Sequence, residues 1–393
     1  MISVEEALAR VLALAAPVRA ETVPLRAALG RVLAAPAAAR LTQPPFDAAA
    51  MDGYAVRAAD HHPGARLRVV GEAGAGHGFG AALAAGEAVR IFTGAPVPEG
   101  AGFVVMQEDV TRDGDTLLLP GALDARQHIR PRGQDFAEGD ALAAPVRLGA
   151  SHLGLLATMN VAEVSVARRP VVAVIATGDE LVMPGEVPGP GQIICSNSFT
   201  LAAMAEAEGA EARLLPIARD TPEALAQVFA LAEGADLIVT SGGASVGDHD
   251  HVGAVAASLG MQRAFWKVAM RPGKPLMAGR MGAAAMLGLP GNPVSAFVAA
   301  RLFLLPLLDA MQGLPGAHAP LAARLATPLP ANGERAHYMR ARLAPGADLP
   351  RITPFAEQDS ALTRLLSEAN ALLIRPAHDA PRAAGDLVNY LPL

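Results

Sequence analysis

Val171-Val-Ala-Val-Ile-Ala-Thr-Gly-Asp-Glu-Leu181 and Asp236-Leu-Ile-Val-Thr-Ser-Gly-Gly-Ala-Ser-Val-Gly247 are built to the same plan. In each stretch, a short apolar run leads directly into a loop of glycine and polar residues. A continuous apolar run of this length is typical of a strand that is buried on both faces. The two stretches therefore predict neighbouring strands of a covered sheet, each ending in a polar loop.

Helical segments surround these two strands. One runs from Ser198 to Glu208 and stops at Gly209, and another starts at Asp220-Thr-Pro222 and ends near Gly234. Glycine after a helix and proline in its first turn are common boundary signals. With a long apolar helix from Val294 to Met311, the alternation of strands and helices predicts a parallel α/β sheet covered on both faces over residues 169–312.

The flanking regions have a different texture. Residues 41–137 are punctuated by glycine and proline between short apolar runs, which predicts a β-rich domain. Residues 1–40 and 138–168 predict a helical and mixed connecting domain, in which Ser3 and Glu6 form a capping box for the first helix. The Pro-rich tail, 313–393, predicts a small separate β domain. The predicted fold class is therefore α/β with β-rich accessory domains.

Composition excludes several classes of protein. The chain has 393 residues, of which 52% are apolar and 18% charged, so it is too apolar for a disordered chain. A net charge of −6 argues against a general binder of nucleic acid or anionic membranes. The single cysteine, Cys195, excludes internal disulfides and thiolate metal clusters, and it suits a reducing cytoplasm.

One stretch is long and apolar enough to suggest a membrane span. Met281 to Ala300 carries no charge, but its middle reads Leu289-Pro-Gly-Asn-Pro293, which would break a spanning helix. We therefore predict a buried strand, a turn and a buried helix there. The acidic residues near Met1 do not fit a signal peptide. The sequence predicts a soluble, cytoplasmic protein.

The predicted strand ends carry the residues of an anion site. Ligands of such sheets bind beyond the carboxyl ends of the strands, and Gly242 and Gly243 would let backbone N–H groups approach an anion. Tight-turn chemistry is the alternative for this loop. Lys267 and Lys274 are the only lysines and flank Arg271, which suggests a phosphate contact, although two lysines can also fall this close by chance.

Acidic residues follow the same strands. Asp179, Glu180, Asp220 and the run Asp248-His-Asp-His251 lie in or near these loops. Carboxylates beside a phosphate cradle usually hold Mg²⁺. The alternation of Asp and His leaves zinc open, and solvated loop charge is the third interpretation. The residues alone thus indicate an α/β protein with a phosphate pocket that uses Mg²⁺.

Taken together, the motifs resemble one family, molybdopterin molybdenumtransferase (the MoeA family), which is related to the E domain of gephyrin. They occur in family order along almost the whole chain. The matching segments are Pro44 to Val56, Ile91 to Pro98, Val105 to Asp109, Arg130 to Asp135, Ala176 to Leu181, Ser196 to Ser198, Ser241 to Gly247, Lys267 to Pro275 and Gly288 to Ser295.

The resemblance implies an elongated subunit that forms a homodimer. Each active site would lie between the α/β domain of one subunit and the β-rich domain of the other. The implied substrates are adenylylated molybdopterin and molybdate. The implied enzyme inserts molybdenum, releases AMP and uses Mg²⁺, which agrees with a pocket that neutralises phosphate charge. It could also contact other proteins of molybdenum cofactor biosynthesis.

The resemblance also implies roles for individual residues. The implied catalytic residues are Asp52, Thr93, Asp135, Glu180, Asp220 and Asp250, of which Glu180, Asp220 and Asp250 would hold the metal. The implied substrate-binding residues are Gly242, Gly243, Lys267, Arg271, Lys274, Pro290, Pro293 and Ser295, with Arg335, Arg340 and Ser360 as ligands for the molybdate oxyanion. On local chemistry alone, Asp52 could instead cap the turn before Gly53, and the Thr93 hydroxyl could bond its own turn.

The chain departs from the family pattern at four places. Ala49-Ala50 replaces the usual Asn-Ser, and Asp359-Ser360-Ala361 replaces Gly-Ser-Gly. Cys195 stands where an acid or amide is common, and Arg271 where lysine is frequent. Two other functions compete with the implied one. A molybdopterin adenylyltransferase would share the α/β domain but would need neither flanking domain, and a non-catalytic scaffold would need no pocket.

Overall fold

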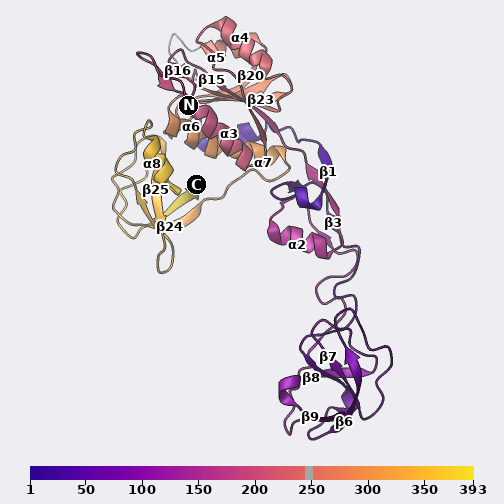
Figure 1. The fold of residues 1–393 in the computed structure, drawn as a ribbon. Coiled ribbons are helices and arrows are strands. Elements are labelled where there is room, and N and C mark those ends of the chain that lie inside the picture. Colours follow the sequence, from indigo (N-terminus) through magenta and orange to yellow (C-terminus); the bar gives the residue numbers. More distant parts are fainter. Residues whose placement is uncertain (244–250) are drawn as a thin grey trace.

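The computed structural model describes residues 1–243 and 251–393. The chain is elongated, with the α/β and C-terminal domains at one end and the β-rich domain at the other (Figure 1). A connecting domain lies between them. The predicted fold class, α/β with β-rich accessory domains in an elongated subunit, is confirmed.

The central sheet of the α/β domain has the strand order β18-β15-β19-β23-β22-β20. Strands β18, β15, β19 and β23 are parallel neighbours. Strand β22 runs antiparallel to both of its neighbours, β23 and β20, so the predicted parallel sheet is in fact mixed. The tight turn between β22 and β23 allows no crossover and therefore forces an antiparallel pair. The strands are β15 (Val171–Ala176), β18 (Glu211–Leu214), β19 (Leu237–Ser241), β20 (Gln262–Trp266), β22 (Met277–Met281) and β23 (Ala284–Leu289), with a small pair, β16 (Leu181–Val182) and β17 (Ile193–Ile194), beside them.

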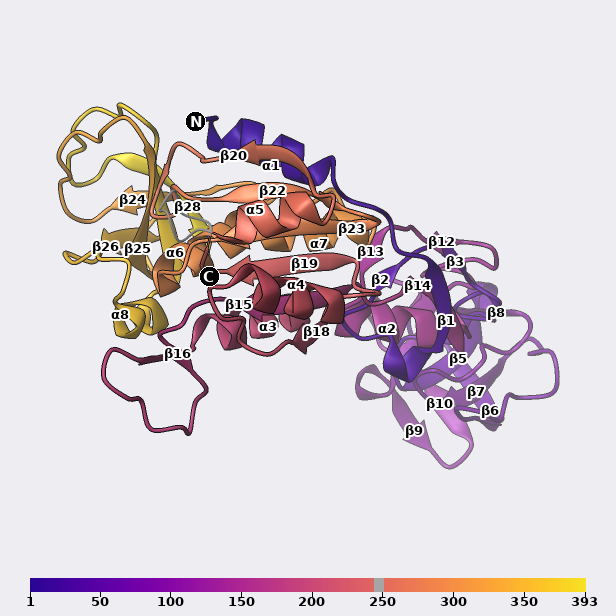
Figure 2. The ribbon, with the colours of Figure 1, turned by 90° about the horizontal axis from the view of Figure 1, so that it is seen from above.

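Helices cover both faces of this sheet (Figure 2). They are α3 (Asn197–Ala207), α4 (Pro222–Leu231), α5 (His251–Ser258), α6 (Pro293–Ala299) and α7 (Leu305–Met311). One core joins α3, α6 and α7 to the sheet around Leu201, Val298 and Phe303, and a second joins α4 and α5 to it around Phe229 and Val255. The apolar strands are therefore buried on both sides, as their continuous apolar sequences require.

The long apolar helix is buried. The predicted strand, turn and helix are confirmed, because β23 ends at Leu289 and a helix begins at Pro293. That helix continues to Met311 through a π-helical turn, Ala300–Leu304. In the described part of the chain, this helix is long and apolar enough to cross a membrane. However, 78% of its most apolar stretch is buried inside the structure. This burial is what a core helix requires.

The first helix lies outside the domain predicted for it. Ser3 caps α1 (Val4–Leu12) as predicted, since its Oγ accepts a hydrogen bond from the backbone N–H of Glu6 at 3.1 Å. However, Val4, Ala7 and Val11 are buried in the core of the α/β domain, against α7 and β20. The apolar stripe of the helix decides this packing, which its position in the sequence could not reveal.

Two discontinuous segments build the connecting domain. Its main sheet has the order β1-β14-β2-β13 and thus joins residues before and after the β-rich domain. Its elements are β1 (Ala20–Pro24), β2 (Val32–Leu33), β3 (Ala37–Ala38), β12 (Ala141–Leu142), β13 (Val146–Arg147), α2 (Ala150–Thr158) and β14 (Glu163–Ala167). The chain leaves the connecting domain after β3 and returns to it at β12, and these two strands pair with each other. The β-rich domain is therefore held at one end of the connecting domain.

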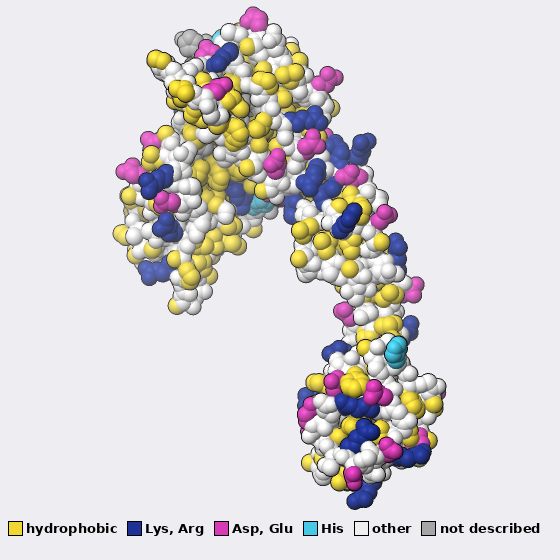
Figure 3. Space-filling model, viewed as in Figure 1, with side chains coloured by type: hydrophobic (Ala, Val, Ile, Leu, Met, Phe, Trp, Pro, Cys, Tyr) yellow, Lys and Arg dark blue, Asp and Glu magenta, His cyan; other side chains and the backbone are white. Residues whose placement is uncertain are grey.

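The β-rich domain is built on a sheet with the order β8-β5-β7-β6-β10-β9. Its strands are β4 (Ala48–Ala49), β5 (Gly53–Arg57), β6 (Arg66–Ala73), β7 (Glu87–Ile91), β8 (Ala101–Met106), β9 (Thr111–Asp113), β10 (Thr116–Leu118) and β11 (Ile129–Arg130). On the face shown in Figure 3, side chains of both charges are interspersed over this domain. That pattern agrees with the sequence argument against a general nucleic-acid binder.

The C-terminal domain is less separate than predicted. Its sheet has the order β21-β25-β26-β24-β28-β27, and β21 (Met270–Arg271) comes from the α/β segment. The other elements are β24 (Leu321–Leu325), β25 (Ala336–Ala344), β26 (Arg351–Pro354), α8 (Thr363–Glu368), β27 (Ala371–Arg375) and β28 (Leu387–Pro392). The strand pair β21–β25 therefore fixes this domain beside the carboxyl end of the central sheet.

Candidate functional site

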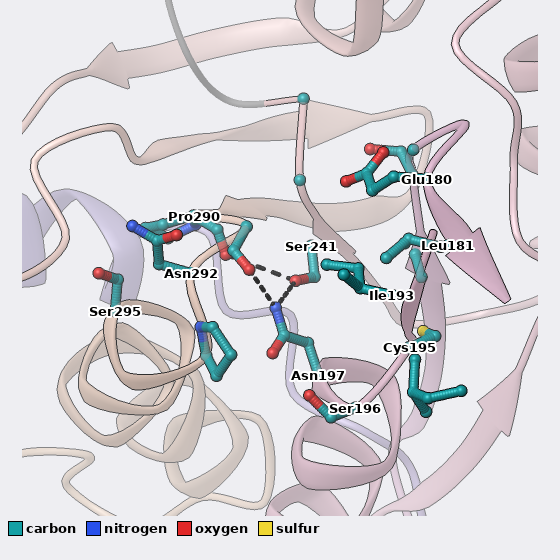
Figure 4. Close-up of a pocket in the computed structure, with 18 of the residues that line it drawn as sticks. Glu180, Leu181, Ile193, Cys195, Ser196, Asn197, Ser241, Pro290, Asn292 and Ser295 are labelled. Atoms are coloured by element: carbon teal, nitrogen blue, oxygen red, sulfur yellow. Dashed lines mark hydrogen bonds between the residues drawn. The ribbon is translucent and has the colours of Figure 1, made fainter. Parts of the chain in front are cut away.

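A cavity of about 690 Å³ opens at the carboxyl ends of β15, β19 and β23. This is the edge where the sequence predicts ligand binding. Among the described residues, it is lined by Ala176 to Gly178, Glu180, Leu181, Ile193 to Asn197, Asp220, Ser241 to Gly243, Pro275, Pro290 to Pro293, Ser295 and Ala361. In the view of Figure 4, the Glu180 carboxylate lies on the same side as Leu181 of β16 and Ile193 of β17, and the hydroxyls of Ser196, Ser241 and Ser295 lie at other places around the cavity.

The two glycines after β19 are sterically required. Gly242 has a φ of +95° and Gly243 a φ of +61°, and both are left-handed conformations that disfavour a side chain. A Cβ on Gly242 would lie 2.6 Å from the Thr177 carbonyl oxygen, and one on Gly243 would lie 2.2 Å from Cγ2 of Val252. The glycines thus let this loop pack directly against the loop that follows β15. Residues 244–250, including the predicted catalytic and metal-binding Asp250, lie outside the described residues.

Arg219 holds the acidic loop in place. Its guanidinium donates hydrogen bonds to the backbone oxygens of Asp179 at 2.8 Å and Leu181 at 3.3 Å. The Asp179 carboxylate in turn accepts one from the backbone N–H of Asp220 at 3.2 Å. These contacts bring Glu180 and Asp220, which are 40 residues apart in sequence, to the same cavity, as predicted for both. We found no sequence signal for Arg219, because all its acceptors are backbone atoms.

The carboxyl group of Asp220 is electrostatically disfavoured as an anion. Its burial raises its pKa, and the negative charges of Asp179 and Glu180 raise it further. A bound cation would relieve both effects. Within the described part of the chain, no group of three or more His, Cys, Asp or Glu side chains is arranged to hold a metal. Glu180 and Asp220 nevertheless fit Mg²⁺. This ion is commonly bound by one or two carboxylates, while substrate phosphates and water fill its other coordination positions.

Asn197 joins three cavity loops. Its Nδ2 donates hydrogen bonds to Ser241 Oγ at 2.8 Å and to the Gly291 carbonyl oxygen at 2.7 Å. Ser241 Oγ donates to the Pro290 carbonyl oxygen at 3.4 Å. These bonds are drawn in Figure 4. Cys195 lines the same cavity, and its Sγ lies 3.2 Å from Ser198 Oγ. Cys195 is therefore a buried thiol in the cavity wall.

The Pro290–Pro293 loop connects the cavity to the C-terminal domain. Pro290, Pro293 and the buried Ser295 all line the cavity, as their predicted roles require. Asn292 Nδ2 donates to Ser360 Oγ at 3.0 Å, and the Ser360 carbonyl oxygen accepts from the backbone N–H of Val294 at the same distance. Ser360 thus reaches this loop although its flanking residues depart from the family pattern.

The predicted cationic residues belong to a segment that reaches the cavity at Pro275. Lys267, Arg271 and Lys274 are not among the described residues that line it. The Lys267 ammonium lies 4.5 Å from the centroid of the Trp266 ring. Their contact with substrate stays a prediction, and the structure brings only Pro275, next to Lys274, to the cavity.

A separate cationic cluster lies at the seam between β21 and β25. In the register of these two parallel strands, Arg271 of β21 lies opposite His337 of β25. Burial and the charges of Arg271, Arg375 and Arg335 lower the pKa of His337 to about 4, so that its imidazole is neutral at pH 7. Arg335 is half-buried there and donates to the Met270 carbonyl oxygen at 3.5 Å. The structure therefore places Arg271 and Arg335 together, at a position where an oxyanion could bind.

The Arg340 side chain has a structural role, and its predicted oxyanion contact stays a prediction. Its side chain is buried, with 1% of its surface exposed. Its guanidinium donates to the carbonyl oxygens of Leu362 at 2.9 Å, Asp359 at 2.9 Å and Glu357 at 3.2 Å. These bonds hold residues 357–362, including the segment that presents Ser360. The sequence spacing alone could not distinguish a buried arginine from one that faces a ligand.

We expect Arg340→Ala to destabilise the protein rather than to weaken substrate binding directly. Removing the buried guanidinium leaves three partly buried carbonyl groups without donors, at a cost of about 3 kcal/mol in the free energy of unfolding. Urea unfolding monitored by circular dichroism measures this change. Unchanged stability combined with lost affinity for molybdate would contradict the structural role.

Asp52 and Thr93 are neighbours on the β-rich domain. The Asp52 carboxylate accepts hydrogen bonds from the Thr93 backbone N–H at 2.8 Å and from its hydroxyl at 2.7 Å. These two bonds lower the pKa of Asp52, so that it is ionised at neutral pH. Asp135 is exposed in a turn near the connecting domain, where its backbone N–H donates to the Gln43 carbonyl oxygen. Within one chain, the β-rich domain lies at the opposite end of the molecule from the cavity (Figure 1).

The fold and site define a multidomain α/β protein that binds a small molecule at the carboxyl ends of its parallel strands. Three family models match consecutive parts of the chain. They are the MoeA N-terminal region (domain I and II) at residues 2–160, the probable molybdopterin binding domain at 173–310, and the MoeA C-terminal region (domain IV) at 322–393. The chain therefore belongs to the MoeA family, as its sequence motifs indicated.

Individual relatives agree with this assignment. A molybdopterin molybdenumtransferase 2 of Mycobacterium tuberculosis is 37% identical over 385 residues, covering 93% of each chain. A molybdopterin molybdenumtransferase of Nostoc sp. is 37% identical over 331 residues, covering 81% of this chain and 76% of the relative. Among solved structures, a molybdopterin biosynthesis MoeA protein from Pyrococcus horikoshii superposes with a TM-score of 0.81 at 30% identity, covering 100% of this chain and 99% of that one.

Proposed function

We propose that this protein is a molybdopterin molybdenumtransferase that inserts molybdenum from molybdate into adenylylated molybdopterin and releases AMP, forming molybdenum cofactor. The observation that carries the proposal is the cavity itself. In a chain of the MoeA family, Glu180, Asp220, Gly242 and Gly243 all line one cavity of about 690 Å³. A cavity of this size suits a small-molecule ligand.

The residues of the chain have separate tasks in this reaction. The backbone around Gly242 and Gly243, which carry no side chains, would accommodate the phosphate. Glu180 and Asp220 would hold Mg²⁺, which supplies charge neutralisation when the phosphoanhydride breaks. Asp52, ionised and fixed by Thr93, would orient a hydroxyl or water by accepting its hydrogen bond. Positioning and electrostatics suffice for such a reaction, and no covalent nucleophile is needed.

The two alternative functions have less support. An adenylyltransferase would use the α/β domain alone, which leaves the Asp52–Thr93 pair and the contact between Asn292 and Ser360 without a purpose. A non-catalytic scaffold would not need glycines that are held against a carboxylate-lined cavity. The complete MoeA domain set favours the transferase.

We further propose that the enzyme is a cytoplasmic homodimer with active sites shared between subunits. The support is geometric: Asp52 lies at the far end of the chain from its own cavity, and a two-fold partner could bring its copy of Asp52 there. The buried free thiol of Cys195 is compatible with a reducing compartment.

AMP release from adenylylated molybdopterin tests this function and the metal together. We expect release only when molybdate and Mg²⁺ are both present, because Glu180 and Asp220 need a cation between them and the phosphates. Chelation should stop release, and added Mg²⁺ should restore it. Liquid chromatography of AMP measures the product. Release without molybdate would contradict the proposed reaction, and restoration by Zn²⁺ but not Mg²⁺ would instead favour the interpretation based on the histidines.

A further inference from the structure

The Asn197 side chain forms hydrogen bonds with two other loops of the cavity. Asn197 is the first residue of α3, and its side chain turns away from its own helix toward two other loops (Figure 4). One of its hydrogen bonds goes to Ser241 at the end of β19, and the other goes to Gly291 after β23. The two acceptors are 44 and 94 residues away in sequence. The side chain thus joins the ends of three separate βα units.

The chemistry of these contacts requires an amide. The NH₂ group of asparagine supplies two donors, which match the Ser241 hydroxyl oxygen and the Gly291 carbonyl oxygen. Because Ser241 accepts from Asn197, its own hydroxyl proton is available for the Pro290 carbonyl oxygen. A carboxylate has no donor and would face the Gly291 carbonyl with another acceptor. The site therefore discriminates between Asn and its isostere Asp.

The helix itself does not need this side chain. Ser196 occupies the N-cap position, and α3 is anchored by the buried residues Leu201 and Ala205. Asparagine has a lower helix propensity than alanine, so local structure would favour alanine at position 197. The reason for asparagine must therefore lie in the loops that it contacts.

Those two loops lie next to each other at the cavity, because β19 and β23 are paired strands and the backbone N–H of Gly242 donates to the Leu289 carbonyl oxygen at 3.2 Å. Ser241 immediately precedes Gly242 and Gly243, which pack against the loop after β15. Gly291 belongs to the loop that carries Pro290 and Pro293 and that contacts Ser360 of the C-terminal domain. The Asn197 side chain thus links the cavity-lining residues 193–197 to these two paired loops, and the shape of the cavity depends on how the two parts are held together.

We propose that Asn197 is a positioning residue that holds residues 193–197 against the glycine loop and the Pro290–Pro293 loop, and so fixes the cavity shape required by the substrate. This inference rests on the proposed function for the identity of that substrate, adenylylated molybdopterin. Asn197 acts through Ser241 and Gly291 and takes no part in the bond changes. Its loss should weaken binding more than it slows the chemical step.

The test compares Asn197→Ala and Asn197→Asp with a matched control, Asn370→Ala. Asn370 also bridges two segments through two hydrogen bonds, to the backbone of Leu343, but in the C-terminal domain. We expect both Asn197 variants to raise the Kd of adenylylated molybdopterin and its KM by about tenfold, with a smaller change in kcat. Asn370→Ala should leave the Kd unchanged. Ser241→Ala combined with Asn197→Ala should be no worse than the single variants, since both disrupt one network.

Hydrogen exchange without ligand gives an independent readout. We expect Asn197→Ala to speed exchange at the amides of residues 241–243 and 291–292, while the amides of β15 and α7 keep their protection. Unchanged exchange and unchanged Kd in both Asn197 variants would overturn the positioning role. An equal loss of affinity in Asn370→Ala would overturn it too, because the effect would then be general. If the unaltered protein does not bind adenylylated molybdopterin, the proposed function fails, and the exchange result alone decides the role of Asn197.

Discussion

A heterodimer of one Asp52→Ala chain and one Asp220→Ala chain is expected to recover about half of the activity of the unaltered protein, because two-fold symmetry leaves one of its two sites intact. Each variant alone should lose activity by about 100-fold or more, as is usual when a catalytic carboxylate is removed. The physical reason is the length of the subunit. Asp220 lines the cavity, whereas Asp52 lies on the β-rich domain at the other end of the same chain.

Differently tagged chains make this measurement direct. Co-expression and two successive affinity steps isolate the heterodimer, and its AMP release is compared with that of each homodimer. In the heterodimer, one site would combine both lesions and the other would combine none. A heterodimer that forms but is no more active than the homodimers would show that each site lies within one subunit. Asp60→Ala, which removes a carboxylate elsewhere on the β-rich domain, is the control that should remain active.

Gly242→Ala is expected to reduce activity by about 100-fold, because displacing a substrate-binding loop by about 1 Å has effects of this size. The added Cβ would meet the Thr177 carbonyl oxygen at 2.6 Å and its Oγ1 at 2.8 Å. Neither the carbonyl nor the strand that carries it can move freely, since Thr177 is buried at the end of β15. The loop must therefore shift, and the phosphate cradle shifts with it.

The variant Gly234→Ala is a control that introduces the backbone strain of a left-handed residue without a steric clash. Gly234 has a φ of +78°, similar to the +95° of Gly242, but its Cβ would meet nothing within 4 Å. We expect this control to lose about 1 kcal/mol of stability, the usual cost of a left-handed non-glycine residue, and to keep its activity. Steady-state kinetics and thermal unfolding of both variants provide the comparison. Equal activity of Gly242→Ala and Gly234→Ala would mean that the glycine loop does not position substrate.

Local sequence patterns were sufficient for several elements of the α/β domain. The apolar runs 171–176 and 236–240 became β15 and β19 with nearly the same limits, and the proline and glycine signals located α4. These predictions hold because burial on both faces leaves a continuous apolar run few alternatives. The same patterns placed Glu180, Asp220, Gly242 and Gly243 at the strand ends, where the structure has the cavity.

Packing between distant segments decided the rest. The sequence could not assign α1 to the α/β core or β21 to the C-terminal sheet, because an apolar stripe or a short strand does not specify its partner. The family resemblance implied Arg340 as an oxyanion ligand, whereas in the structure its guanidinium donates to backbone carbonyl oxygens.

The sequence by itself determined the class of fold, the family and the residue types at the strand ends. Only the tertiary structure decided which of those residues share a cavity and what holds them there. Arg219 and Asn197 act on backbone atoms and on a serine far away in the chain. Every residue type has a backbone carbonyl group, so a contact with one does not restrict the amino acid at that position. Contacts between residues 40 or more positions apart also produce no periodic pattern, so such interactions cannot be read from a single sequence.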